Sequence, residues 1–192
     1  RCGKKIIEYA KKYTKNNIRA REDAHDGEVN FNASLNDVKY GDMILCRNTA
    51  PLMEIYRRKV AEGKKIYFRG EGLGSSLKEA VDCTFGTTIN EIILNMKSRL
   101  ISFWELITKD QDLTYRETAT NPYIISLYDT IKTMESLPED IKTRDELYLF
   151  IDNVFSNEGH EGIQLSTIHR AKGLEADNVY IICPSLVPSR LS

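Results

Sequence analysis

The feature that most constrains the fold of this chain is an amphipathic helix between two short apolar runs. The runs lie at 43–46 and 65–68, and turn residues bound each of them, as is typical of buried strands. A helix is predicted over 51–62, because a proline lies in its first turn and Gly63 ends it. A strand, a helix and a strand at this spacing predict a βαβ unit with parallel strands.

Strand-like runs return near the end of the chain, at 163–167 and 179–183, with a polar loop between them. The second of these runs is apolar throughout and predicts a buried strand. Near the beginning, apolar residues at helical spacing predict a helix over 4–15. Together these elements predict an α/β fold whose parallel sheet is built from residues 1–72 and 160–192.

The stretch between these two parts, residues 73–159, shows only helical periodicity. Two capping boxes, in which a threonine precedes a glutamate by three residues, open helices within it: Thr88 with Glu91, and Thr143 with Glu146. Asn121 and Pro122 open another. We expect an all-helical subdomain inserted into the α/β domain, with the glycines of 70–74 forming a flexible crossing into it.

Charge is divided unevenly between these parts. Residues 1–70 contain 16 Lys and Arg against 9 Asp and Glu, a balance of +7, whereas residues 71–159 contain 8 against 16, a balance of −8. A basic face is typical of a phosphate-bearing partner, although charge alone also describes an ordinary solvated surface. The acidic balance makes the helical subdomain a poor surface for nucleic acid and a plausible one for a basic protein partner.

Composition excludes two classes of protein. Hydrophobic residues make up 41% of the 192 residues and charged residues 29%, and no apolar run exceeds five residues, against about 20 for a membrane helix. Extensive disorder and a membrane span are therefore excluded. The four cysteines lie far apart, without a C-x-x-C pair, and each is in or beside an apolar stretch. We interpret them as reduced core thiols of a cytoplasmic protein, and we expect no metal site.

The densest cluster of polar residues directly follows the strand predicted at 163–167. It reads Thr167-Ile168-His169-Arg170-Ala171-Lys172-Gly173-Leu174-Glu175. Ligands of open parallel sheets bind outside the carboxyl ends of the strands, so a site is expected here. Threonine, histidine and lysine side chains donate hydrogen bonds to phosphate oxygens, a glycine lets the backbone approach a ligand, and a glutamate accepts from a sugar hydroxyl.

This cluster closely resembles motif V of the UvrD/Rep group of superfamily 1 DNA helicases, which reads T-x-H-x-x-K-G-L-E between two apolar strands. Arg1 with the helix after it resembles motif IV. The stretch 44–48 resembles the strand-R-x-N segment of the second motor domain, except that Arg47 and Asn48 are adjacent here. A helical insertion fits the same family. The resemblance implies the second RecA-like domain of an ATP-driven motor that moves along single-stranded DNA, usually 3′ to 5′.

The resemblance also implies a role for individual residues. Arg1 would be catalytic, reaching the γ-phosphate and stabilising its transfer, a role that suits an always-charged fork of donors. The nucleotide-binding set is Arg1, Lys172, Gly173 and Glu175, with Glu175 holding the ribose. The DNA-binding set is Arg47, Asn48, Thr167 and His169. The implied partners are single-stranded DNA and an N-terminal motor domain of the same, longer protein.

The sequence lacks the motifs that hydrolyse ATP. No G-x-x-x-x-G-K-[ST] pattern occurs. The apolar run before Asp152 imitates a Mg²⁺-binding strand, but Thr143 and Glu146 predict a helix there. Because the chain begins with Arg1 rather than Met and stops just after a strand-like run, we expect it to be a piece of a longer protein without a complete active site of its own. ATP and Mg²⁺ are expected as cofactors of that protein, with none bound by the isolated chain, which should not hydrolyse ATP.

Two other interpretations stay open at this point. A catalytically inert module that binds nucleic acid or protein could keep the same fold. A small nucleotide-binding α/β enzyme could instead use the glycines of 70–74 as a phosphate loop, although their spacing is not G-x-G-x-x-G. The second interpretation predicts tight nucleotide binding by this chain alone, whereas the first predicts a longer protein without intact ATPase motifs.

Overall fold

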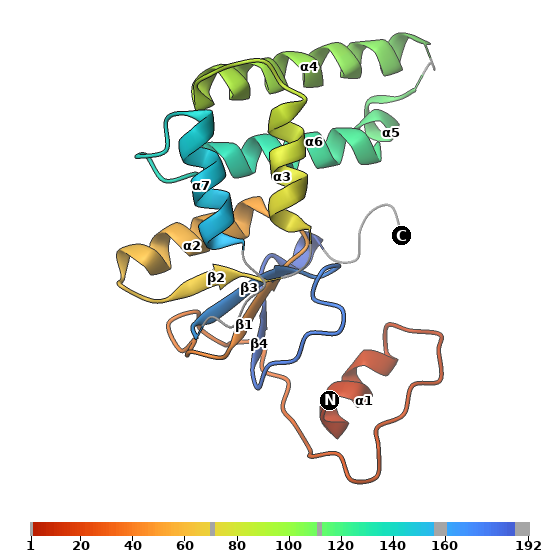
Figure 1. The fold of residues 1–192 in the computed structure, drawn as a ribbon. Coiled ribbons are helices and arrows are strands. Elements are labelled where there is room, and N and C mark those ends of the chain that lie inside the picture. Colours follow the sequence, from red (N-terminus) through yellow and green to blue (C-terminus); the bar gives the residue numbers. More distant parts are fainter. Residues whose placement is uncertain (1, 70–71, 111–112, 156–160, 187–192) are drawn as a thin grey trace. The chain divides into compact units, whose positions relative to one another are not determined.

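The computed structural model describes residues 2–69, 72–110, 113–155 and 161–186. The chain divides into two compact units, residues 1–38 and residues 39–192, which are described separately (Figure 1). The second unit contains the sheet and most of the helices. The sequence instead predicts a helical subdomain, residues 73–159, inserted into a motor domain made of residues 1–72 and 160–192. This division differs from the two compact units and stays a prediction.

A parallel sheet of four strands forms the centre of the second unit, in the order β2-β3-β1-β4. Its strands are β1 (Met43–Cys46), β2 (Ile66–Phe68), β3 (Ile163–Thr167) and β4 (Val179–Ile181). β1 and β3 are adjacent although 117 residues separate their ends, Cys46 and Ile163. The predicted α/β class with a parallel sheet is confirmed.

Helix α2 (Ala50–Ala61) connects β1 to β2 and packs on β1, β2 and β3. Leu52 and Met53 are completely buried, as are Ile44 of β1 and Leu165 of β3. The crossover from β1 through α2 to the sheet is the βαβ unit that the sequence predicts. Burial of this apolar layer stabilises the parallel sheet at about 25 cal/mol for each Å² of apolar surface removed from water.

Strand β4 differs from the prediction of a buried strand over 179–183. It ends at Ile181, and the side chains of Val179 and Ile181 are 50% and 58% exposed. The reason is its position, because β4 is an edge strand that pairs only with β1 in the described sheet. An apolar composition alone does not distinguish an edge strand from a central one.

The remaining α-helices of the second unit lie between β2 and β3 along the chain, and a short 3-10 helix (Pro184–Leu186) follows β4 (Figure 1). The α-helices are α3 (Leu73–Asp82), α4 (Ile89–Asp110), α5 (Tyr115–Ala119), α6 (Pro122–Glu135) and α7 (Arg144–Val154). α4 packs on α6, α3 packs on α7, and α6 also packs on α2. The capping boxes predicted at Thr88 and Thr143 are both present. Helix α5 was not predicted, because five residues are too few to show a helical period. A capping box of Thr114 with Glu117 opens it.

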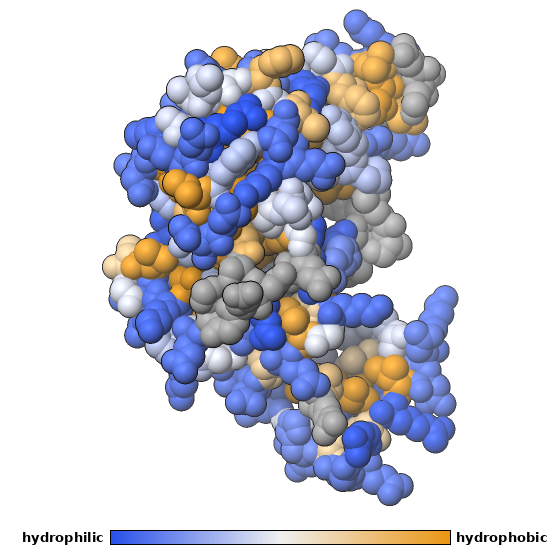
Figure 2. All heavy atoms as spheres, in the orientation of Figure 1, coloured by the Kyte–Doolittle hydropathy of each residue, from blue (hydrophilic) through white to orange (hydrophobic). Residues whose placement is uncertain are grey.

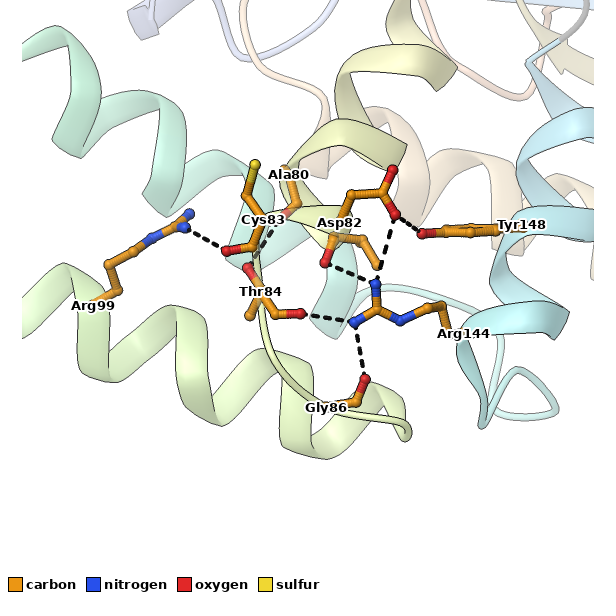
Figure 3. Close-up of polar contacts among 9 residues, drawn as sticks. Ala80, Asp82, Cys83, Thr84, Gly86, Arg99, Arg144 and Tyr148 are labelled. Carbon is orange, nitrogen blue, oxygen red and sulfur yellow. Dashed lines mark hydrogen bonds and ion pairs between the residues drawn. The ribbon is translucent and has the colours of Figure 1, made fainter.

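The turn that follows α3 is closed by Arg144, the first residue of α7 (Figure 3). The guanidinium donates to the carbonyl oxygens of Val81 at 3.2 Å, Thr84 at 2.7 Å and Gly86 at 2.9 Å. It also lies 3.6 Å from the carboxylate of Asp82, which accepts a hydrogen bond from Tyr148. Val81 lies in the last turn of α3, and Thr84 and Gly86 belong to the turn after it, so one arginine ties the end of α3 and its following turn to α7.

The first unit contains α1 (Lys4–Lys11), whose first turn is held by the backbone of a later segment. The amides of Lys4 and Lys5 donate to the carbonyls of His25 and Asp26 at 2.9 and 2.8 Å. The predicted helix over 4–15 is therefore too long by about one turn. The α-helical pattern ends at Lys11, because the amides of Lys12 and Tyr13 donate to carbonyls three residues earlier, as in a 3-10 turn. Tyr13, which was expected on the apolar face, is 75% exposed.

The prediction that all four cysteines are core thiols is wrong for three of them. Cys2, Cys83 and Cys183 are exposed, and Cys46 is buried. Cys83 lies at the end of α3 and Cys183 follows the edge strand β4, so neither has a second layer to cover it. Burial raises the pKa of Cys46 to about 11, which keeps its thiol protonated.

On the face drawn in Figure 2, hydrophobic side chains reach the surface in separate patches among hydrophilic ones.

Candidate functional site

The carboxyl ends of β1 and β3 lie side by side and define the candidate site. The register pairs Cys46 with Thr167, the last residue of each strand. The pairing extends one step further, since the amide of Ile168 donates to the carbonyl of Cys46 at 2.9 Å. The residues that follow each strand therefore leave the sheet at the same edge, as the predicted position of the site requires.

Arg47 and His169 meet at this edge. An Nη1–H of Arg47 donates to Nε2 of His169, although 122 residues separate them in sequence. A guanidinium has no acceptor atom, so Arg47 is the donor in this contact. Arg47 and Asn48 are partly exposed and His169 is exposed. Two residues of the predicted DNA-binding set are thus in direct contact, with a third beside them.

Thr167, the fourth member of that set, occupies a different environment. Its side chain is only 8% exposed, because it ends the central strand β3. Its carbonyl accepts from the amides of Arg170 and Ala171 at 3.0 and 2.9 Å, which closes the turn after the strand. A contact between the Thr167 side chain and DNA stays a prediction. In this structure Thr167 shapes the turn that presents His169.

The predicted nucleotide-binding residues lie on the loop that continues from this turn. Lys172, Gly173 and Glu175 are all exposed. Gly173 has a φ of +87°, a conformation that L side chains rarely adopt, and no atom lies within 4 Å of the position of an added Cβ. The backbone conformation therefore favours glycine at this position, and the space beside its Cα is open. Arg1, the remaining predicted residue, lies outside the described residues.

Asp129 of α6 is a site-adjacent residue that the sequence did not indicate. Its carboxylate accepts from the amides of Thr49 and Ala50 at 2.8 and 3.1 Å, at the beginning of α2. The side chain of Thr49, the N-cap residue, does not cap α2, so the carboxylate of Asp129 from α6 caps it instead. Burial raises the pKa of Asp129, and the two amide bonds and the charge of Arg47 oppose that shift.

No local pattern could have revealed this contact. Asp129 stands in α6 on the side away from its apolar stripe, where a solvated carboxylate is the usual expectation. A weak signal was Thr133 four residues later, which is also buried and donates to the carbonyl of Asp129 at 2.8 Å. Two polar residues one turn apart are compatible with a second packed face, and α6 uses that face against α2.

Among the described residues, no group of three or more histidine, cysteine, aspartate or glutamate side chains could hold a metal ion. In the same part of the chain, no helix combines the length and the apolarity that a membrane crossing requires. Asp152, which follows the strand-like apolar run of the sequence, lies in α7 and forms a 2.6 Å ion pair with Lys78. The helical prediction for that run is confirmed.

Comparison with known proteins gave one match. A family model described as the UvrD-like helicase C-terminal domain matches residues 91–192, which is more than half of the chain. No curated protein and no solved structure matches. The matched residues include β3, β4 and the loop with His169, Lys172 and Glu175, whereas Arg47 and Asn48 lie before them.

Proposed function

The chain belongs to the UvrD-like helicase C-terminal domain family, and we propose that it is the second motor domain of an ATP-dependent helicase or translocase that acts on single-stranded DNA. Its parallel α/β sheet has the RecA-like class expected of such a domain. The observation that carries the proposal is the contact between Arg47 and His169, because it joins two predicted DNA-binding segments at one edge of the sheet.

The proposed DNA-binding surface comprises Arg47, Asn48, Thr167 and His169. Arg47 supplies a fixed positive charge, and the partly exposed Asn48 beside it offers an amide that both donates and accepts. Such groups bind phosphate and sugar oxygens, which positions a strand without reading its sequence. Because the surface lies after two parallel strands, a bound strand would run across the ends of β1 and β3.

The proposed nucleotide contacts are Arg1, Lys172, Gly173 and Glu175. The exposed ammonium of Lys172 suits a phosphate oxygen and the carboxylate of Glu175 suits a ribose hydroxyl. The chain has no G-x-x-x-x-G-K-[ST] cradle, so these residues are one side of an ATP and Mg²⁺ site that the N-terminal motor domain completes. The proposal places the protein in the cytoplasm and makes the acidic helical segment a candidate surface for a protein partner.

The proposal is tested on the protein with both motor domains, by measuring its affinity for an oligo-dT strand and its DNA-stimulated ATPase. We expect Arg47→Ala to weaken DNA binding by about 5- to 100-fold, the scale of one or two lost charge-assisted hydrogen bonds. The salt dependence of binding should also decrease by about one phosphate contact. His169→Ala should weaken binding and change the salt dependence less than Arg47→Ala does, because only the arginine is a fixed cation.

The matched control is Arg58→Ala, which removes the same side chain from the exposed surface of α2, where it faces Glu62. It should bind DNA like the wild type. Equal affinities of Arg47→Ala and the control would contradict the proposed surface. A protein that binds DNA through Arg47 but has no ATPase activity would instead support the inert binding module.

A further inference from the structure

Arg170 lies in the middle of the turn that joins the two proposed ligand surfaces. It follows His169 directly and precedes Lys172 by two residues. Its backbone amide closes the turn on the carbonyl of Thr167. Its side chain, however, leaves the turn, and Nη2 donates to Oγ of Ser76 in the first turn of α3 at 2.9 Å. The turn after β3 is thereby fastened to the helix that begins the helical segment.

The guanidinium also lies directly against the residue that precedes α3. Gly72 is the N-cap of α3 and has a φ of +74°. A Cβ on Gly72 would lie 2.8 Å from Nη1 of Arg170, closer than real Cβ atoms come to another heavy atom. The left-handed backbone favours glycine at position 72, and the absence of a Cβ lets the end of the Arg170 side chain lie against it.

Helix α3 contacts α7 at several points along its length. A Cβ on Gly74 would lie 2.9 Å from both Ile151 Cγ2 and Phe155 Cβ, so α3 and α7 approach closely there. Further along, Lys78 pairs with Asp152 at 2.6 Å. At its far end, the carbonyls after α3 are held by Arg144 of α7 (Figure 3). These contacts join α3 to α7 from its first turn to the turn that follows it.

We propose that Arg170 is a positioning residue that couples the turn between the DNA-binding and nucleotide-binding residues to the position of α3 and α7. The inference rests on the proposed function, since it assigns a regulatory contact to the same site. A ligand that shifts the turn shifts α3 through Arg170 and Ser76. By thermodynamic linkage, a partner that holds the helical segment changes ligand affinity at the turn by the same factor.

The test uses the protein with both motor domains and compares Arg170→Ala, Ser76→Ala and the double variant. ATPase activity is measured without DNA and with saturating oligo-dT, and hydrogen exchange of α3 is measured with and without the strand. We expect Arg170→Ala to lower the stimulation by DNA about 5-fold or more, the usual scale of allosteric coupling, while basal ATPase is unchanged. The effect of DNA on hydrogen exchange in the first turn of α3 should disappear.

Ser76→Ala removes only an exposed hydroxyl, so it tests the contact even if Arg170→Ala does not fold. The double variant should be no worse than Arg170→Ala, because both changes break one contact. Arg170→Lys keeps the charge without the planar fork and should restore stimulation only in part. Arg58→Ala is the control and should retain full stimulation.

Two outcomes overturn the coupling and can be told apart. If the wild type is stimulated by DNA and Arg170→Ala is stimulated equally, the contact is structural and the coupling role is wrong. Independent, additive effects of Ser76→Ala and Arg170→Ala lead to the same conclusion. If the wild type neither binds the strand nor hydrolyses ATP, the proposed function fails first, and the coupling fails with it.

Discussion

Replacing Asp129 with alanine removes the acceptor that holds the beginning of α2. In the wild type its two carboxylate oxygens accept from the amides of Thr49 and Ala50, at 2.8 and 3.1 Å. Ala50 is buried, so water cannot easily take over as its partner. The substitution should destabilise α2 just beyond the end of β1, where Arg47 leaves the sheet.

The expected magnitude is a balance of two effects. Losing a helix cap costs about 0.5–2 kcal/mol, and a hydrogen bond to a charged group contributes about 1.5–3 kcal/mol. Burial of the carboxylate raises its pKa, which means that its surroundings disfavour the charged form. This cost of burying the charge offsets part of the stabilisation that the two hydrogen bonds provide. We expect Asp129→Ala to lower the free energy of unfolding by about 1–3 kcal/mol.

Urea denaturation of the 192-residue chain measures this change directly. The midpoint should fall while the m-value, which follows the surface exposed on unfolding, stays the same. The matched control is Asp152→Ala, since the Asp152 side chain is 65% exposed and pairs with Lys78 on the surface. That change should cost about 0–1 kcal/mol. If Asp129→Ala is no more destabilising than Asp152→Ala, the capping role is refuted.

The pH dependence gives a second check on Asp129. Its pKa is raised in the folded state, so the folded protein binds the proton more tightly than the unfolded chain. Its contribution to stability is therefore full below the ordinary value of about 3.9 and falls as pH rises through the raised pKa. As pH rises from about 3.9 to the raised pKa, the difference in the free energy of unfolding between the wild type and Asp129→Ala should decrease. Above the raised pKa it should stay constant.

Three further predictions concern other parts of the chain. Gly162→Ala should destabilise the sheet by about 1–3 kcal/mol in the same urea assay, because its Cβ would lie 2.6 Å from the carbonyl oxygen of Lys65. Glu146 has a lowered pKa because the amides of Lys142 and Thr143 donate to it, so Glu146→Gln should be less stable than the wild type near pH 6, and this difference should shrink as pH falls from the ordinary glutamate value of about 4.3 through the lowered pKa. The isolated chain should release no phosphate from ATP with oligo-dT present, and measurable turnover would contradict its place as one half of a motor.

The sequence alone determined the elements whose signals are local. The apolar run at 43–46 and the strand-like run at 163–167 became adjacent parallel strands, and the capping boxes at Thr88 and Thr143 open helices as predicted. A hydrogen bond between a side chain and an amide three residues away depends only on nearby sequence. The cluster from Thr167 to Glu175 was likewise readable, because it is continuous along the chain and pointed to the family that the comparison confirmed.

Only the tertiary structure decided which distant groups meet. It made β4 an exposed edge strand, left three cysteines at the surface, brought Asp129 to the beginning of α2 and set Arg170 on Ser76. Each of these outcomes depends on strand order or on helix packing between segments dozens of residues apart. The period of a sequence reports which residues share a face, but it carries no information about which other face will cover it.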